Sequence, residues 1–255
     1  LSSLYKDLIN PSYLAISSDK RFLYTIHGDC SEVTSFSIDF NGALTQINQQ
    51  STEGKNPVHL VLSPNGTELI VTNHLTDSIA VFPIRSDGGL EKLSQLVTLT
   101  GTLGPHRIEQ TSVKPHQSIF DPSGRFIITP AKGSDEIFSI LFENGRLVES
   151  SLRRTQGRES AGCRHIVFHP SGNFAYVINE LDSTITVYDY SVESGLEPKQ
   201  LISSVAETFV KNSRGAAIIV NKAGTHLYAS NRGEDSIGIF SINQSSGMIK
   251  YQATV

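Results

Sequence analysis

Apolar and polar residues alternate with a period of two in short runs along the whole chain. Examples are residues 185–187 and 237–239, while residues 126–129 and 174–178 are rich in β-branched and aromatic side chains. This alternation is typical of β-strands, and no stretch keeps a 3.6-residue apolar period over three turns. The pattern therefore predicts an all-β chain.

The strands recur in five similar units. Each unit joins an apolar strand to a returning strand through a tight turn, as in PHQSIFDPSGRFIITPAK from Pro115 and CRHIVFHPSGNFAYVINE from Cys163. The turn residues, at successive spacings of 46, 58, 48 and 52 positions, are Lys20, Gly66, Gly124, Gly172 and Gly224. Two further strands follow each hairpin after polar turns such as Asn144-Gly145. Repeats of about 50 residues with four antiparallel strands each are typical of β-propeller blades.

The five units predict one propeller domain over residues 1–255. The blade units lie near residues 10–55, 56–113, 114–161, 162–213 and 214–255. We expect the innermost strand of each blade to be the most continuously apolar, because it would be buried on both faces. The connection over residues 101–114 is unusually long, and loops of that length tend to be functional or mobile.

Hairpin geometry predicts where chemistry collects. The start of the first strand and the end of the second lie at one edge, so residues eight before and eight after each turn residue should surround one mouth. The first set is Ser12, Val58, His116, Arg164 and Ala216, and the second set is Gly28, His74, Lys132, Glu180 and Arg232. The last three units thus bring cations, an imidazole and a carboxylate together, which suits an anionic ligand and acid–base chemistry. Ordinary solvated end residues are the alternative interpretation.

Several nearby polar residues have a structural and a functional interpretation. His74 and Lys132 would help to neutralise an anion or lie solvated at the rim, and His165 would line or support the mouth. His59 occupies the position that matches His165 and is expected to be a structural histidine. Three arginines within residues 153–158 would either steer an anionic substrate or be simply solvated.

Composition excludes several classes of protein. The 21 Lys and Arg against 25 Asp and Glu give a net charge of −4, which argues against a nucleic acid or an anionic membrane as partner. No apolar run approaches the roughly 20 residues of a spanning helix. Two cysteines, Cys30 and Cys163, cannot form a disulfide framework, and Cys163 is expected to be a small core residue. Neither the compartment nor the oligomeric state follows from these features.

Motifs for metals and cofactors are missing. His165 and His169 would lie roughly 13 Å apart on a strand, too far to share one metal ion. Phosphate loops of the form G-x-x-x-x-G-K, G-x-S-x-G elbows and H-E-x-x-H helices do not occur. We therefore expect no metal and no cofactor.

Four strings carry a family resemblance. PHQSIFDPSGRF, RHIVFHPSGNFAYVINEL, LYASNRGEDSI and NPSYLAISSDKRFLY resemble the lactonase family of seven-bladed propellers, which includes 6-phosphogluconolactonase and the fungal carboxy-cis,cis-muconate cyclase. The resemblance implies an enzyme that opens, or reversibly closes, the lactone ring of a sugar acid such as 6-phosphogluconolactone. A small anionic lactone or sugar acid is then the partner, with muconate cycloisomerase-like activity as second choice. A non-catalytic binding or surface scaffold propeller is the alternative, since blades alone do not establish turnover.

The muconate cyclase branch also implies site residues. Its proposed acting residues fall on His116, Arg164, Glu180 and Arg232, which hairpin geometry selects as well. The resemblance implies that the arginines hold a carboxylate or phosphate, while His116 and Glu180 move protons or orient water.

The chain departs from the family pattern in two respects. Five full units are visible where the family has seven, so about two blades are expected to be absent, and residues 1–9 resemble the outer strand of a preceding blade. Ala217 stands where family members commonly carry an acidic residue, so a ligand or support contact is expected to be lost there.

Overall fold

The computed structural model describes residues 4–6 and 8–255, and these form twenty strands in five antiparallel sheets. Blade 1 contains β1 (Pro11–Ile16), β2 (Phe22–His27), β3 (Glu32–Ile38) and β4 (Leu44–Ser51). Blade 2 contains β5 (Pro57–Leu62), β6 (Glu68–Asn73), β7 (Ser78–Pro83) and β8 (Gln95–Thr98). Blade 3 contains β9 (Ile119–Phe120), β10 (Phe126–Ala131), β11 (Glu136–Glu143) and β12 (Arg146–Gln156). Blade 4 contains β13 (Cys163–Phe168), β14 (Phe174–Asn179), β15 (Thr184–Ser191) and β16 (Gly195–Ser203). Blade 5 contains β17 (Arg214–Val220), β18 (His226–Arg232), β19 (Ser236–Ile242) and β20 (Ile249–Thr254).

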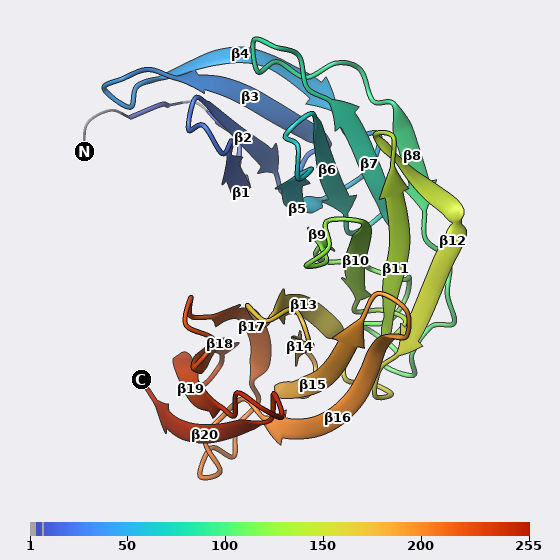
Figure 1. Cartoon of the computed structure of the whole chain (residues 1–255), viewed down its shortest axis with the longest axis vertical. Helices are drawn as coiled ribbons and strands as arrows, with labels where there is room; N and C mark the ends of the chain where they lie inside the picture. Colours follow the sequence, from blue (N-terminus) through green and yellow to red (C-terminus); the bar gives the residue numbers. More distant parts are fainter. Residues whose placement is uncertain (1–3, 7) are drawn as a thin grey trace.

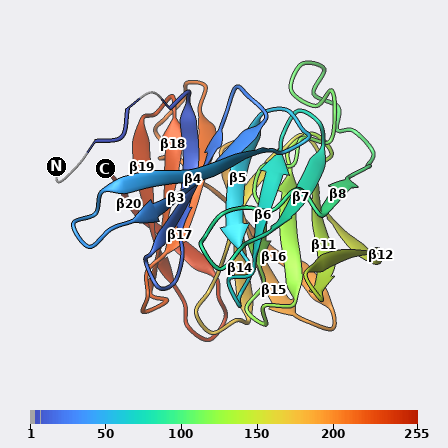
Figure 2. The ribbon, with the colours of Figure 1, turned by 90° about the horizontal axis from the view of Figure 1, so that it is seen from above.

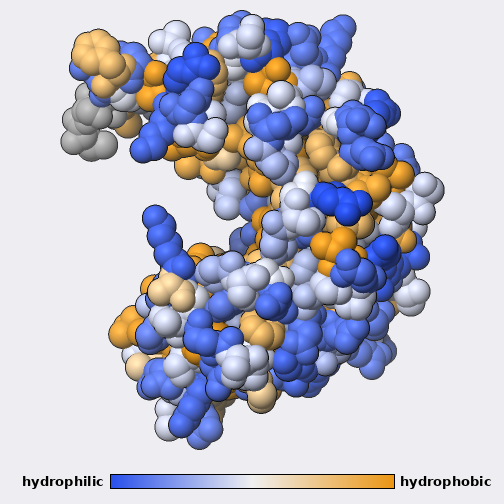
Figure 3. Space-filling view, viewed as in Figure 1, coloured by the Kyte–Doolittle hydropathy of each residue, from blue (hydrophilic) through white to orange (hydrophobic). Residues whose placement is uncertain are grey.

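The blades follow one another round an arc, with the first strand of each toward the centre and the fourth outside (Figure 1). Seen from above, the connection between β8 and β9, drawn in green, stands out at one end of the blades (Figure 2). The space-filling view shows the arc open on the side between blades 1 and 5 (Figure 3). The expected all-β fold of four-stranded antiparallel blades is confirmed. The described residues include no helix that could cross a membrane.

The core lies between neighbouring blades. Ile70 and Val81 of blade 2 pack with Ile127 and Phe138 of blade 3, and similar clusters join the other successive pairs. In blades 3 and 4 the second strand is the most buried: every residue of β10 and of β14 is buried, whereas the first strands β9 and β13 are only partly buried. The expectation that the innermost strand would be the most apolar is therefore wrong. In these two blades the second strand has a strand on each side and a neighbouring blade on each face, whereas the first strand borders the centre of the arc.

The hairpin turns form as the repeat predicts. Gly66, Gly124, Gly172 and Gly224 have φ between 69 and 79°, and Lys20 takes the same left-handed conformation at 59°. In blade 3, the Asp121 carboxylate accepts bonds from two backbone N–H groups beyond the turn, which closes the hairpin. These turns fix the register and so determine which residues reach the opposite end of each blade.

The segment before β1 packs on blade 1. The Tyr5 ring lies edge-on to Phe36 with centroids 4.9 Å apart, and its hydroxyl donates to Gln46 Oε1 at 3.0 Å. Residues 4–6 and 8–9 contain no strand, so the expected outer strand of a preceding blade does not form there; residues 1–3 and 7 lie outside the described residues. Phe36 offers the Tyr5 ring an apolar partner on blade 1 itself.

Candidate active site at the mouth of the blades

A β-bulge lies at the mouth end of the first strand in four blades. The residues that the bulges leave out of the strand register are Ser12, Val58, Arg164 and the pair Ala216–Ala217. A bulge bends its strand and re-aims a side chain. In blade 4, Arg164 lies at such a bulge, while Glu180 follows the end of β14 and donates its N–H to the Gly162 carbonyl at 2.8 Å. The bulge and the strand end thus present their side chains at one edge.

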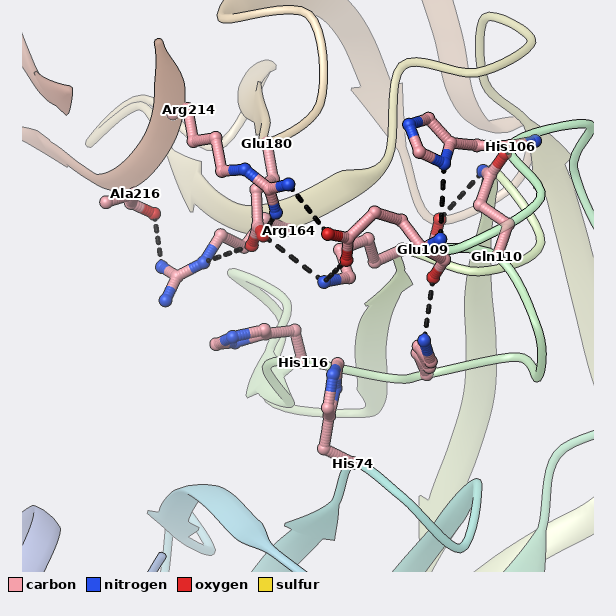
Figure 4. A network of polar contacts seen from close by, with 12 residues as sticks. His74, His106, Glu109, Gln110, His116, Arg164, Glu180, Arg214 and Ala216 are labelled. Carbon is pink, nitrogen blue, oxygen red and sulfur yellow. Dashed lines mark hydrogen bonds and ion pairs between the residues drawn. The ribbon is translucent and has the colours of Figure 1, made fainter. Parts of the chain in front are cut away.

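Glu180 is the centre of an ionic network at this edge (Figure 4). Its Oε1 lies 3.2 Å from Lys132 Nζ and 3.4 Å from Arg214 Nη1. Its Oε2 lies 3.0 Å from Arg164 Nε and 3.2 Å from Arg232 Nη2. The Glu180 side chain is only 5% exposed, so one buried carboxylate holds cations from three blades.

Burial and charge act in opposite directions on this carboxylate. Burial alone would raise the pKa of Glu180, but Lys132, Arg232 and Arg164 together hold it below its ordinary value. Burial lowers the pKa of Arg164 to about 10, and Glu180 opposes part of that shift. At neutral pH the network therefore holds an ionised carboxylate among charged cations.

A group of imidazoles continues from the ionic network. Nη1 of Arg164 lies 3.3 Å from Nε2 of His165, and that Nε2 lies 3.3 Å from Nδ1 of His116. The His116 ring also lies 5.1 Å from the His74 ring, and Nδ1 of His74 donates to the Pro115 carbonyl at 3.0 Å. Three imidazoles from blades 2, 3 and 4 thus adjoin the arginine that contacts Glu180.

Hydrogen-bond chemistry assigns the proton on His116. The Arg164 guanidinium can only donate, so Nε2 of His165 is an acceptor. For the contact between His165 and His116 to form at the same time, Nδ1 of His116 must carry a proton. Nε2 of a neutral His116 then keeps a lone pair that can accept a proton.

The imidazoles are held in their neutral form. Burial lowers the pKa of His116 well below its ordinary value, and the charge of Arg164 adds to the effect. The same two causes lower the pKa of His165. Burial also lowers the pKa of His74. The neutral ring of His116 therefore keeps a lone pair free to accept a proton at neutral pH.

His59 adds a fourth imidazole to this group, next to His165. Its ring lies 6.2 Å from the His165 ring and 4.3 Å from the Tyr13 ring, and its side chain is buried. Its Nδ1 is buried without a hydrogen-bond partner among the described residues. Burial lowers the pKa of His59 to about 3, so this ring is also neutral.

Sequence reasoning missed two residues of the network. Glu109, in the connection between β8 and β9, lies 3.1 Å from Lys132 Nζ and 2.7 Å from Arg214 Nη2. Arg214 pairs directly with Arg232 in the hairpin of blade 5. Each mouth residue at the end of a second strand pairs through its backbone with the residue 18 positions earlier, as Glu180 does with Gly162. The same spacing applied to Arg232 leads to Arg214, so this repeat could have identified Arg214. Only the unusual length of the connection pointed to Glu109.

Other candidates lie apart from the network. Arg153 and Arg154 belong to the outer strand β12, where they donate to the carbonyls of Val192 and Thr100. Arg158 pairs with Asp182 at 2.9 Å. These arginines therefore form local contacts of their own. Cys163 is buried, and burial raises the pKa of its thiol far above its ordinary value.

Comparison with known proteins places this architecture. Residues 1–255 match the family model described as lactonase, 7-bladed beta-propeller. The chain belongs to this lactonase family. It is 32% identical over 246 residues to a 6-phosphogluconolactonase of Bacillus subtilis, covering 95% of this chain and 69% of the relative. It is 33% identical over 264 residues to a 6-phosphogluconolactonase of Formosa agariphila, covering 98% of this chain and 73% of the relative.

A solved lactonase structure agrees with the fold. The Pseudomonas aeruginosa periplasmic gluconolactonase superposes with a TM-score of 0.88 at 26% identity, covering 96% of this chain and 72% of that chain. Together with the family match, this confirms the prediction of a lactonase-type enzyme. The family model has seven blades, and the described residues of this lactonase form five.

Among the described residues, no group of three or more His, Cys, Asp or Glu side chains is arranged to hold a metal ion. At Ala217, where an acidic residue was expected in the family, the backbone N–H donates to Ser230 Oγ at 2.9 Å. The methyl side chain of Ala217 can supply neither a charge nor a hydrogen bond at this place. The mouth of the blades presents imidazole, guanidinium, ammonium and carboxylate groups.

Proposed function

We propose that this chain hydrolyses the lactone ring of an anionic sugar acid, with 6-phosphogluconolactone as the first candidate. The observation that carries the proposal is the unbroken set of contacts from His116 through His165 and Arg164 to Glu180 and Arg232. Relatives named 6-phosphogluconolactonase support the choice of substrate.

In the proposed reaction, His116 is the general base. Its Nε2 takes a proton from a water molecule while the water oxygen bonds to the lactone carbonyl carbon. The bond between that carbon and the ring oxygen then breaks, and the proton passes to the ring oxygen, which becomes a hydroxyl group. One water is consumed and one carboxylic acid is formed. A positioned base of this kind contributes about 10²–10⁴-fold in rate.

Arg164 and Arg232 bind anionic groups in this proposal. Each guanidinium is held through contacts that use only part of its donors: Arg164 contacts Glu180, His165 and the Ala216 carbonyl, and Arg232 contacts Glu180 and the Gly215 carbonyl. The remaining donors suit a phosphate or the oxyanion that develops at the carbonyl. Arg164, which is 14% exposed and beside the imidazoles, is assigned to the oxyanion, and the half-exposed Arg232 to the phosphate.

Glu180 is assigned a positioning role in place of proton transfer. A general acid needs a raised pKa, whereas the pKa of Glu180 is lowered and both of its oxygens are occupied by cations. Lys132 and His165 support the same arrangement, and His74 contacts the far side of His116. The charged groups gather at one mouth, which favours this enzyme over the scaffold alternative.

The test measures hydrolysis of 6-phosphogluconolactone and of gluconolactone against the spontaneous rate in the same buffer. We expect His116→Ala to lose most of the rate above background and Arg164→Ala to lose both rate and apparent affinity. A wild-type chain that never exceeds the spontaneous rate on either lactone would contradict the proposal.

A further inference from the structure

Glu109 brings a second carboxylate into the mouth from outside the repeat. Its Oε2 contacts Lys132 Nζ and its Oε1 contacts Arg214 Nη2, at 3.1 and 2.7 Å. Figure 4 shows this side chain reaching from its loop toward Arg214 and Glu180. The side chain is 20% exposed, so it is largely enclosed by these partners.

The loop is built to hold Glu109 in this place. Gln110 donates to the Lys132 carbonyl at 3.0 Å and accepts from the His106 N–H at 3.0 Å. The Glu109 carbonyl accepts from Lys114 Nζ at 2.8 Å, and the Lys114 N–H donates to Asp77 Oδ1 at 2.7 Å. Hydrogen bonds thus hold this segment to blade 3 through Gln110 and to blade 2 through Lys114.

Lys132 and Arg214 are consequently shared between two carboxylates. Both already contact Oε1 of Glu180, at 3.2 and 3.4 Å, and Glu109 closes on their other side. Two cations that converge on one carboxylate form a site that could equally bind a carboxylate or phosphate group of a ligand. The Arg214 hydrogen bond lowers the pKa of Glu109 to about 2, with Lys132 adding to the effect, so this position stays negatively charged.

We propose that Glu109 occupies a second anion position and so sets the charge preference of the site. With Glu109 in place, Arg232 remains for the phosphate and Arg164 for the carbonyl oxygen, and a further anionic group that comes near Lys132 meets a like charge. This inference rests on the proposed lactonase function, whose product differs from its substrate by one new carboxylate. Glu109 therefore weakens the binding of the ring-opened product relative to a ligand with the phosphate alone.

The experiment compares two ligands by calorimetry on the full chain. 6-Phosphogluconate carries a phosphate and a carboxylate, whereas glucose 6-phosphate carries the phosphate alone. In Glu109→Gln, we expect 6-phosphogluconate to bind about 10-fold or more tighter, since a charge-assisted contact becomes available. Glucose 6-phosphate should change by less than about 3-fold.

The matched control is Glu143→Gln, which removes the same charge from an exposed position at the opposite end of blade 3. It should leave the ratio of the two affinities unchanged. A ratio in Glu109→Gln that equals the wild-type ratio or favours glucose 6-phosphate, or no binding of 6-phosphogluconate, overturns the inference. Glu109→Ala repeats the measurement, and thermal unfolding checks both variants; if both are unfolded, Glu109 is structural and the inference is overturned.

The proposed function fails separately from this inference. Absence of lactone turnover in the wild-type chain would remove the reaction, while the ratio of the two binding constants would still report on Glu109. Conversely, a fully active wild-type chain with an unchanged ratio in Glu109→Gln would keep the reaction and remove the charge role.

Discussion

Blades 1 and 4 have the same backbone arrangement at the mouth, but blade 4 places charged side chains there and blade 1 does not. Gly28 donates its N–H to the Asn10 carbonyl at 3.0 Å, as Glu180 does to Gly162 at 2.8 Å. Both first strands carry a bulge, at Ser12 in one blade and at Arg164 in the other. The blade scaffold therefore fixes where a side chain lies, and the residue placed there decides whether that blade takes part in chemistry.

The largest effect is expected at Glu180. Glu180→Gln keeps the shape but leaves four neighbouring cations without their shared carboxylate. We expect kcat/KM on 6-phosphogluconolactone to fall about 100-fold, because displaced catalytic groups cost roughly that much. Unfolding in urea should show a loss of about 3 kcal/mol, the lower end for breaking a buried pair, since two of its partners are half exposed.

The comparison provides its own control for Glu180. Ser12→Ala changes the mouth of blade 1 and should leave both kcat/KM and stability close to wild type. Equal losses of activity in the two variants would mean that blade 1 takes part in the site and that the contrast between the blades is false.

Arg164 should show the next largest effect. Its guanidinium contacts Glu180 through Nε and both the Ala216 carbonyl and His165 through Nη1, and the single nitrogen of an ammonium group cannot reproduce this planar fork. Arg164→Lys should reduce kcat by about 10-fold or more by losing donors to the oxyanion and to His165. Arg232→Lys, at a half-exposed position, should act mainly on KM and by less. Steady-state kinetics separates the two, and a loss confined to KM in Arg164→Lys would contradict its assigned role.

The architecture was predictable because every blade repeats the same sequence pattern of turns and strands. Turn residues such as Gly124 and Gly172 mark each hairpin, and the alternating strands between them leave one consistent fold. The convergence of His116, Arg164, Glu180 and Arg232 at one end followed from counting eight residues either way. Repetition makes local patterns redundant, so small errors in register do not change the result.

The rest of the site depends on departures from that repetition. The bulge at Ala216–Ala217 shifts the pairing of blade 5 at the mouth, where Arg232 lies opposite Arg214 and not Ala216. Glu109 belongs to a connection without a counterpart in the other units, and its ion pair with Arg214 joins residues 105 positions apart. No periodic pattern encodes a contact of that kind.

Buried imidazoles distinguish the blades in their response to acid. His59 occupies in blade 2 the place that Tyr13 occupies in blade 1, and burial lowers its pKa to about 3. Above the unfolded value of about 6.5 the ring is neutral in both states. Below this pH the unfolded chain binds a proton at His59 that the folded chain does not bind. The free energy of unfolding therefore decreases as the pH is lowered, by up to about 1.4 kcal/mol per pH unit.

The variant His59→Gln removes that contribution and keeps a polar side chain. Urea unfolding between pH 7 and 4.5 should give a shallower decline in the variant than in the wild type, by up to one proton. His116 and His165, whose pKa values are also lowered, should maintain the remaining slope, and Glu109 should add to it below about pH 4.5. Parallel curves for the two proteins would show that His59 is not held neutral by the fold.

The smallest effect is expected at Gly28, the counterpart of Glu180 in blade 1. A Cβ there would lie 3.0 Å from Ser12 Cβ and Oγ and 3.2 Å from Asn10 Nδ2. Both neighbours are exposed side chains that can move by a few tenths of an ångström, and Gly28 does not need a positive φ. Gly28→Ala should therefore cost less than about 1 kcal/mol in urea unfolding and leave kcat/KM unchanged. If its activity fell as far as that of Glu180→Gln, the position within the blade and not the carboxylate would control the site, and the charge network could no longer explain catalysis.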